Sequence, residues 1–96
     1  MSLRETLSLR REQILQAAAR HGAGDVRVIG SVARGEERAD SDVDLLVRWK
    51  PDTSLLDHAA LQLELEELLG RRVDLASDGW IKPRVRDSVY RDARPV

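Results

Sequence analysis

The feature that most constrains the fold is a pair of aspartates at the start of an apolar run, DVDLLVRW. Asp42 and Asp44 are two positions apart, and such side chains in a strand point to the same face of the sheet. The opposite face of the strand is then filled by Val43, Leu45 and Val47. The run is apolar enough to predict a strand buried on both faces. Because carboxylates are costly to bury uncompensated, this strand needs a cation close to its aspartates.

The rest of the chain alternates between helical and strand patterns. We predict helices at about residues 2–21 and 53–70 and from Pro83 onward, a short helical turn at 31–35, and strands at 26–29, 43–49 and 72–77. A polar loop is expected at 36–41 and a turn at Asp78–Gly79. The predicted fold class is α/β, a small mixed sheet flanked by helices, in one domain over residues 1–96.

The apolar residues of the helices predict which faces cover the sheet. In the first helix these residues are Leu3, Leu7, Ile14 and Ala18. In the helix at 53–70, the stripe consists of Leu61, Leu65 and Leu68, and we expect Leu56 and Leu63 to widen the same face. Gly70 is expected to end this helix.

Composition excludes several classes of function. There is no cysteine, so disulfides and cysteine-based metal or redox sites are excluded. The 16 basic and 17 acidic residues nearly cancel, which gives no electrostatic footprint for nucleic acid. No apolar run has the length needed to span a bilayer, and the first residues do not form a signal peptide. We expect a cytoplasmic protein that binds neither membranes nor nucleic acid directly.

The carboxylates favour a site for divalent metal ions. Two carboxylates on one face repel each other unless one is protonated or a cation lies between them. Oxygen ligands alone favour Mg²⁺ or Mn²⁺ over zinc. Asp74 also alternates with apolar residues, so pairing of its strand with that of Asp42 and Asp44 would bring a third carboxylate to this face. Three such carboxylates suit a two-metal site for in-line attack at phosphorus, although Asp74 on an edge strand could instead face water.

A candidate phosphate site lies upstream. Gly30 and Ser31 connect the first strand to the short helix, where a glycine allows close approach of a phosphate and free N–H groups favour an anion. The Ser31 hydroxyl would add a hydrogen bond, and Arg34 a positive charge. The simpler alternatives are that Ser31 only caps the helix and that Arg34 only pairs with Glu36 or Glu37.

Gly-Ser, a ten-residue spacer and Asp-x-Asp together resemble the nucleotidyltransferase superfamily that includes DNA polymerase beta. The longer stretch GSVARGEERADSDVDLLV resembles the minimal nucleotidyltransferases, the MNT proteins. The resemblance implies Mg²⁺-dependent transfer of a nucleoside monophosphate, AMP from ATP, to a hydroxyl. It implies that Asp42 and Asp44 hold two metal ions, that Asp74 holds the one near the acceptor, and that Gly30 and Ser31 hold the terminal phosphates.

MNT proteins are typically paired with a helical HEPN protein, often an RNase toxin, and act as its antitoxin. The resemblance therefore implies a protein adenylyltransferase that modifies a HEPN-type partner. Two alternatives stay open: a non-catalytic antitoxin that neutralises its partner by contact, and a nucleotidyltransferase acting on a small molecule. The sequence leaves the partner, the base specificity and the homo- or hetero-oligomeric state undetermined.

Overall fold

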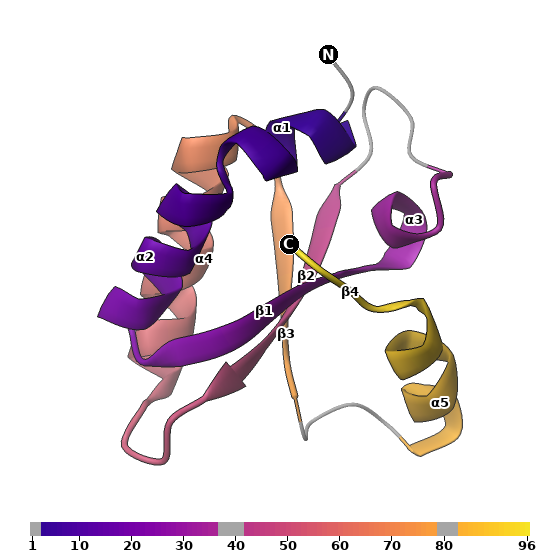
Figure 1. Cartoon of the computed structure of the whole chain (residues 1–96). Coiled ribbons are helices and arrows are strands. Elements are labelled where there is room, and N and C mark those ends of the chain that lie inside the picture. The colour runs from indigo at the N-terminus through magenta and orange to yellow at the C-terminus, as the bar shows by residue number, and fades with distance from the viewer. Residues whose placement is uncertain (1–2, 37–41, 79–82) are drawn as a thin grey trace.

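The computed structural model describes residues 3–36, 42–78 and 83–96, which form a four-stranded mixed sheet with helices on both faces (Figure 1). In chain order the elements are α1 (Leu3–Leu9), α2 (Arg11–Arg20), β1 (Ala23–Ile29), α3 (Gly30–Ala33), β2 (Val43–Trp49), α4 (Leu55–Leu69), β3 (Val73–Ser77), α5 (Pro83–Asp92) and β4 (Arg94–Pro95). The predicted α/β class is confirmed. The predicted loop at 36–41, except for Glu36, and Gly79 of the predicted turn lie outside the described residues.

The strand order in the sheet is β3-β2-β1-β4. β1 pairs antiparallel with β2 and with β4, whereas β2 and β3 are parallel. A parallel pair needs a crossover connection, and α4 provides it. Strand β4 was not predicted, because two residues are too short to show a pattern; in it Arg94 pairs with Val28, and Pro95 with Arg27.

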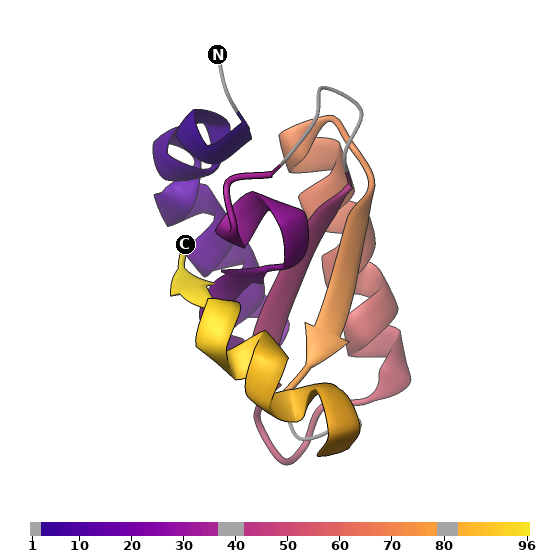
Figure 2. The same ribbon diagram turned by 90° about the vertical axis from the view of Figure 1, so that its right-hand side faces the viewer.

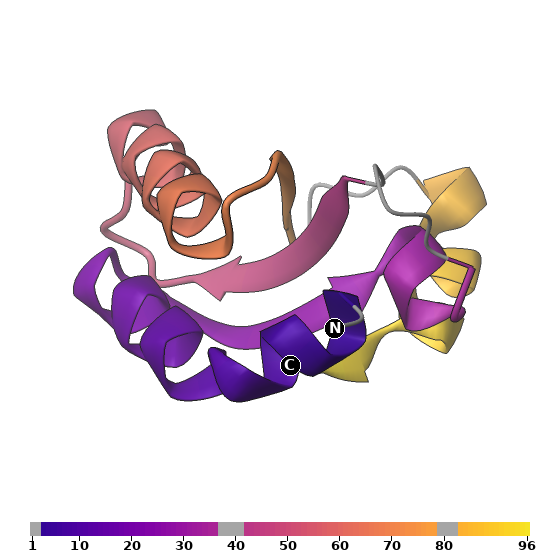
Figure 3. The ribbon, with the colours of Figure 1, turned by 90° about the horizontal axis from the view of Figure 1, so that it is seen from above.

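One face of the sheet carries the hydrophobic core. Helices α1, α2 and α4 lie on this side, and α3 and α5 lie on the other (Figures 1 and 3). The predicted inward set of β2, Val43, Leu45 and Val47, is fully buried here. Leu46 points to the other face and is also fully buried, so the prediction that β2 is covered on both sides is confirmed. The strand is therefore held from both faces, together with Asp44, its second residue.

The prediction of one N-terminal helix is wrong, because the helix is interrupted at Arg10, with φ −96° and ψ 8°. The predicted apolar stripe is nevertheless buried, with Leu3 and Leu7 on α1 and Ile14 and Ala18 on α2. The break separates the two halves of this stripe. Each half can then follow the curved sheet and bury its own apolar residues.

Helix α4 ends as predicted, with Gly70 in the left-handed conformation at φ 68°. Its start is fixed by a capping box, in which the Asp57 carboxylate accepts a hydrogen bond from the Ser54 backbone N–H at 2.9 Å. The prediction for Leu56 and Leu63 is wrong: they are 81% and 66% exposed. At about 100° per residue, both point away from the face of Leu61, which is fully buried.

The sheet face opposite the core is covered in part by α3 and α5 (Figure 2). Helix α5 is anchored through Asp78, whose carboxylate accepts hydrogen bonds from the Tyr90 hydroxyl and from Arg27 and Arg48. The hydrogen bond from Tyr90, followed by the nearby arginines, holds the pKa of Asp78 below its usual range. Arg27 also lies 5.7 Å from the centre of the Tyr90 ring. These contacts hold α5 over the end of the sheet that carries Asp78. No helix in the described ranges is long and apolar enough to cross a bilayer.

Candidate active site

The sheet register brings the predicted carboxylates together. Asp44 on β2 pairs with Asp74 on the parallel strand β3 and with Ile29 on β1. Residues paired in register point to the same face, so Asp44 and Asp74 lie side by side on the face opposite the core. Asp74 also acts on the titration of Asp44, because its charge and a side-chain hydrogen bond with it both raise the pKa of the Asp44 carboxyl. Asp42 lies directly before β2 and is exposed, whereas Asp44 is half-buried.

The cluster is electrostatically strained around Asp44. Burial raises the pKa of the Asp44 carboxyl, and the negative charges of Asp74 and Asp42 raise it further. The positive charge of Arg34 acts in the opposite direction. A cation beside Asp44 would therefore stabilise the ionised form that burial and its neighbours oppose.

The donor set fits a hard divalent cation. Asp42 and Asp74 line a cavity of about 190 Å³ together with Gln62, Glu66 and Arg72. Apart from the Arg72 guanidinium, the polar side chains here offer oxygen ligands, which suit Mg²⁺ or Mn²⁺. Among the described residues, no three His, Asp or Glu side chains are already placed to hold a metal ion. Binding of one metal ion through all three aspartates would therefore require their side chains to move closer together.

Gly30 is required by the position of Asp44. Its φ is +72°, a conformation that favours glycine, and a Cβ built on it would lie 2.3 Å from Oδ2 of Asp44. The sequence reasoning assigned this glycine to phosphate approach and missed its contact with Asp44. The Ile29–Asp44 pairing, which follows from the β1–β2 register, is the signal that could have revealed it.

The short helix α3 begins at Gly30, directly beside the carboxylates. The predicted hydrogen bond from Ser31 cannot be placed, because its side chain lies outside the described part of the structure. Arg34 follows α3 and pairs with Glu36 at 3.2 Å and with Asp92 of α5 at 3.5 Å. The ion pair with Glu36 considered from the sequence is therefore present. Arg34 remains close enough to Asp44 to lower its pKa.

Sequence reasoning also missed the contribution of α4 to the edge of the site. Gln62 and Glu66 are one turn apart and line the cavity with Asp42 and Asp74. The Glu66 carboxylate accepts a hydrogen bond of 3.0 Å from the backbone N–H of Val73, next to Asp74. Two polar residues at i and i+4 beside the apolar stripe were the available signal.

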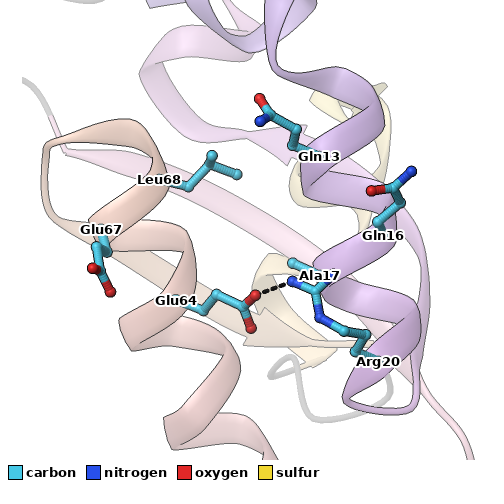
Figure 4. Close-up of a pocket in the computed structure, with 7 residues that line it drawn as sticks. All are labelled: Gln13, Gln16, Ala17, Arg20, Glu64, Glu67 and Leu68. Atoms are coloured by element: carbon cyan, nitrogen blue, oxygen red, sulfur yellow. Dashed lines mark hydrogen bonds and ion pairs between the residues drawn. The ribbon is translucent and has the colours of Figure 1, made fainter.

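A larger cavity of about 400 Å³ lies elsewhere, between α2 and α4 (Figure 4). Its lining is polar, and across it Glu64 on α4 is paired with Arg20 on α2. Hydrogen bonds from His21 and Arg20 lower the pKa of Glu64. These charges are paired with each other, whereas burial and the charges of Asp74 and Asp42 raise the pKa of Asp44 in the aspartate cluster. The aspartate cluster is therefore the stronger candidate for catalysis.

Known proteins resemble the chain in sequence and in fold. The model of the nucleotidyltransferase domain family matches residues 11–95. Protein adenylyltransferase MntA of Thermococcus cleftensis is 37% identical over 92 residues, which cover 96% of this chain and 93% of that protein. A solved structure proposed to be a minimal nucleotidyltransferase is 57% identical, with a TM-score of 0.88, and the match covers 100% of this chain and 97% of the other. A toxin–antitoxin crystal structure with AMP-PNP shares the fold at 18% identity, with a TM-score of 0.67 over 99% of this chain and 72% of the other.

The contact between Gly30 and Asp44 predicts different outcomes for two alanine variants. Gly30→Ala and Gly35→Ala place alanine at nearly the same φ, +72° and +73°. This backbone conformation alone should lower the free energy of unfolding of each variant by about 1–2 kcal/mol. Only the Gly30 variant meets Asp44, since nothing lies within 4 Å of a Cβ at Gly35. We expect Gly30→Ala to displace the Asp44 carboxyl and return its pKa toward the ordinary range, as measured by a carboxyl ¹³C NMR titration. An Asp44 pKa that stays raised in Gly30→Ala would contradict this.

The raised pKa of Asp44 predicts how stability depends on pH. The folded state holds this proton to a higher pH than the unfolded state, whose carboxyl titrates near 3.8. Stability contributed by the protonated form is therefore lost as the pH rises through the folded pKa. We expect Asp44→Asn to raise the Tm at pH 7 in EDTA, with a gain that shrinks as the pH falls toward 4. Asp52→Asn, at an exposed position, is the control; an equal gain in both variants would rule out this cause.

Proposed function

Because the chain belongs to the nucleotidyltransferase domain family, we propose that it is a nucleotidyltransferase that moves AMP from ATP to a hydroxyl of a partner protein. The observation that carries the proposal is the register pairing of Asp44 with Asp74, beside Gly30 and next to Asp42. Nothing in a purely structural role explains three carboxylates at one open end of a sheet. Their mutual repulsion destabilises the folded state, and binding of a metal ion for catalysis would explain why they lie together.

Asp42, Asp44 and Asp74 are the residues proposed to hold Mg²⁺, with two ions expected. When bound, the metal would neutralise the carboxylates, orient the triphosphate and stabilise negative charge at the phosphorus under attack. Among the three aspartates, Asp44 is the most fixed, because it is held between Gly30 and Asp74. Asp42 is exposed and free to adjust to the bound nucleotide.

The reaction forms a bond between the acceptor hydroxyl oxygen and the α-phosphorus of ATP. The bond between that phosphorus and the bridging oxygen breaks, and pyrophosphate leaves. The hydroxyl proton passes to a carboxylate; Asp74 is proposed for this step because it is exposed and lies beside Asp44 on the neighbouring strand. The start of α3, with Gly30 and Ser31, is proposed to hold the terminal phosphates. Arg34 is proposed to add positive charge there, which is supported by its effect on the pKa of Asp44.

The proposed partner is a HEPN-type toxin, so that the chain acts as an antitoxin. Two similarities support a toxin as the partner: a relative named protein adenylyltransferase MntA, and a toxin–antitoxin crystal structure with AMP-PNP that shares the fold. The HEPN type of the partner rests on the resemblance of the sequence to the MNT proteins. The choice of ATP rests on the same two proteins. Neutralisation of the partner by contact alone is the alternative that the test must separate.

Co-expression with the protein encoded beside this gene tests the function. We expect the partner to gain the mass of one or more AMP groups by intact mass spectrometry. Asp42→Asn combined with Asp44→Asn should abolish this gain by removing the charge that holds the metal. Asp52→Asn, an exposed aspartate outside the cluster, is the matched control and should leave it unchanged. An unmodified partner that binds the intact chain and the double variant equally would favour neutralisation by contact.

A further inference from the structure

The outer face of α4 carries an apolar ridge, defined as Leu56, Ala59, Ala60 and Leu63. All four are exposed, the two leucines by 81% and 66%. We propose that this ridge is the docking surface for an apolar helix with basic flanks on the acceptor protein. The inference rests on the proposed transfer to a protein.

Helical geometry places the four residues on one stripe. Their spacing of three, four and seven residues is that of one helix face, and Leu56 and Leu63 differ by only about 20° around the axis. Single exposed leucines are common on protein surfaces, but a continuous apolar stripe two turns long indicates a binding surface. An amphipathic helix is the usual partner of such a stripe, because its own apolar residues have the same spacing.

The ridge leads to the candidate active site. Gln62 neighbours Leu63 in the chain, and Glu66 lies one turn beyond Gln62; both line the cavity that holds Asp42 and Asp74. Helix α4 lies on the outside of the molecule next to β3, which carries Asp74 (Figure 2). A segment seated on the ridge therefore lies next to the side of α4 that carries Gln62 and Glu66 and borders this cavity, and the chain that continues from it can bring an acceptor hydroxyl toward the aspartates.

Charge identifies the kind of helix that fits. Helix α4 contains four acidic residues and neither lysine nor arginine: Asp57, Glu64, Glu66 and Glu67. Glu64 is paired with Arg20, but Glu66 and Glu67 extend the negative charge that begins at the aspartate cluster. A partner with basic residues beside its apolar stripe complements this surface. Two copies of this chain joined ridge to ridge would instead place like charges together.

The test uses a double variant with a matched control. Leu56→Gln with Leu63→Gln removes the apolar ridge without adding charge and keeps good helix formers. Leu9→Gln is the control, because Leu9 is also exposed, by 69%, but lies on α1. The probe is the protein encoded beside this gene, with binding measured by calorimetry and AMP transfer by intact mass. Binding of ATP with Mg²⁺ is measured separately and should be equal in all versions.

We expect the double variant to bind the partner about tenfold or more weakly and to lose AMP transfer in proportion, while Leu9→Gln matches the intact chain. Binding and transfer by the double variant equal to those of the intact chain would contradict the docking role of the ridge but would not contradict the proposed function. Binding that needs the ridge, without transfer by the intact chain, would support the ridge and contradict the function. Absence of any binding, or self-association of the chain that the double variant abolishes, would overturn the docking proposal.

Discussion

The rest of the structure is organised around the half-buried carboxylate of Asp44, which is held against Gly30 on one side and beside Asp74 on the other. The antiparallel pairing of β1 with β2 brings the first neighbour, and the parallel pairing of β2 with β3 brings the second. Each contact opposes ionisation or crowds the side chain, so the site is not the lowest-energy choice for an isolated sheet. Local strain of this kind is typical of positions retained for chemistry rather than for stability.

The two faces of the sheet have different roles, since one carries the hydrophobic core and the other carries the carboxylates. One face buries Val43, Leu45 and Val47 under α1, α2 and α4. Burial of this core stabilises the fold and offsets the free-energy cost of placing carboxylates together on the other face. The other face is covered by α3 and α5 only in part, with α5 anchored through Asp78 at the far end. Helix α4 contributes both to the core and to the edge of the candidate site. Leu61 and Leu65 hold it on the core, and Gln62 and Glu66 form the rim of the carboxylate cavity.

The sequence predicted the parts that follow from periodicity. The alternation around Asp42 and Asp44 located β2 and its inward residues, and Gly70 located the end of α4. The sequence also predicted the core-facing Leu61 and Leu65 of α4, but it wrongly added Leu56 and Leu63, because leucine on several sides of a helix leaves the limits of its apolar face unclear. The contact between Gly30 and Asp44 depends on the register of two strands, and the pairing of β4 depends on the whole fold. Neither leaves a local pattern in the chain.

The most direct test of the central claim is a crystal structure with Mn²⁺ and a non-hydrolysable ATP analogue, with the metals located by anomalous scattering. We expect manganese ligated by Asp42, Asp44 and Asp74, with the triphosphate running toward Gly30 and the start of α3. Manganese bound elsewhere, or a triphosphate that contacts none of the three aspartates, would contradict it.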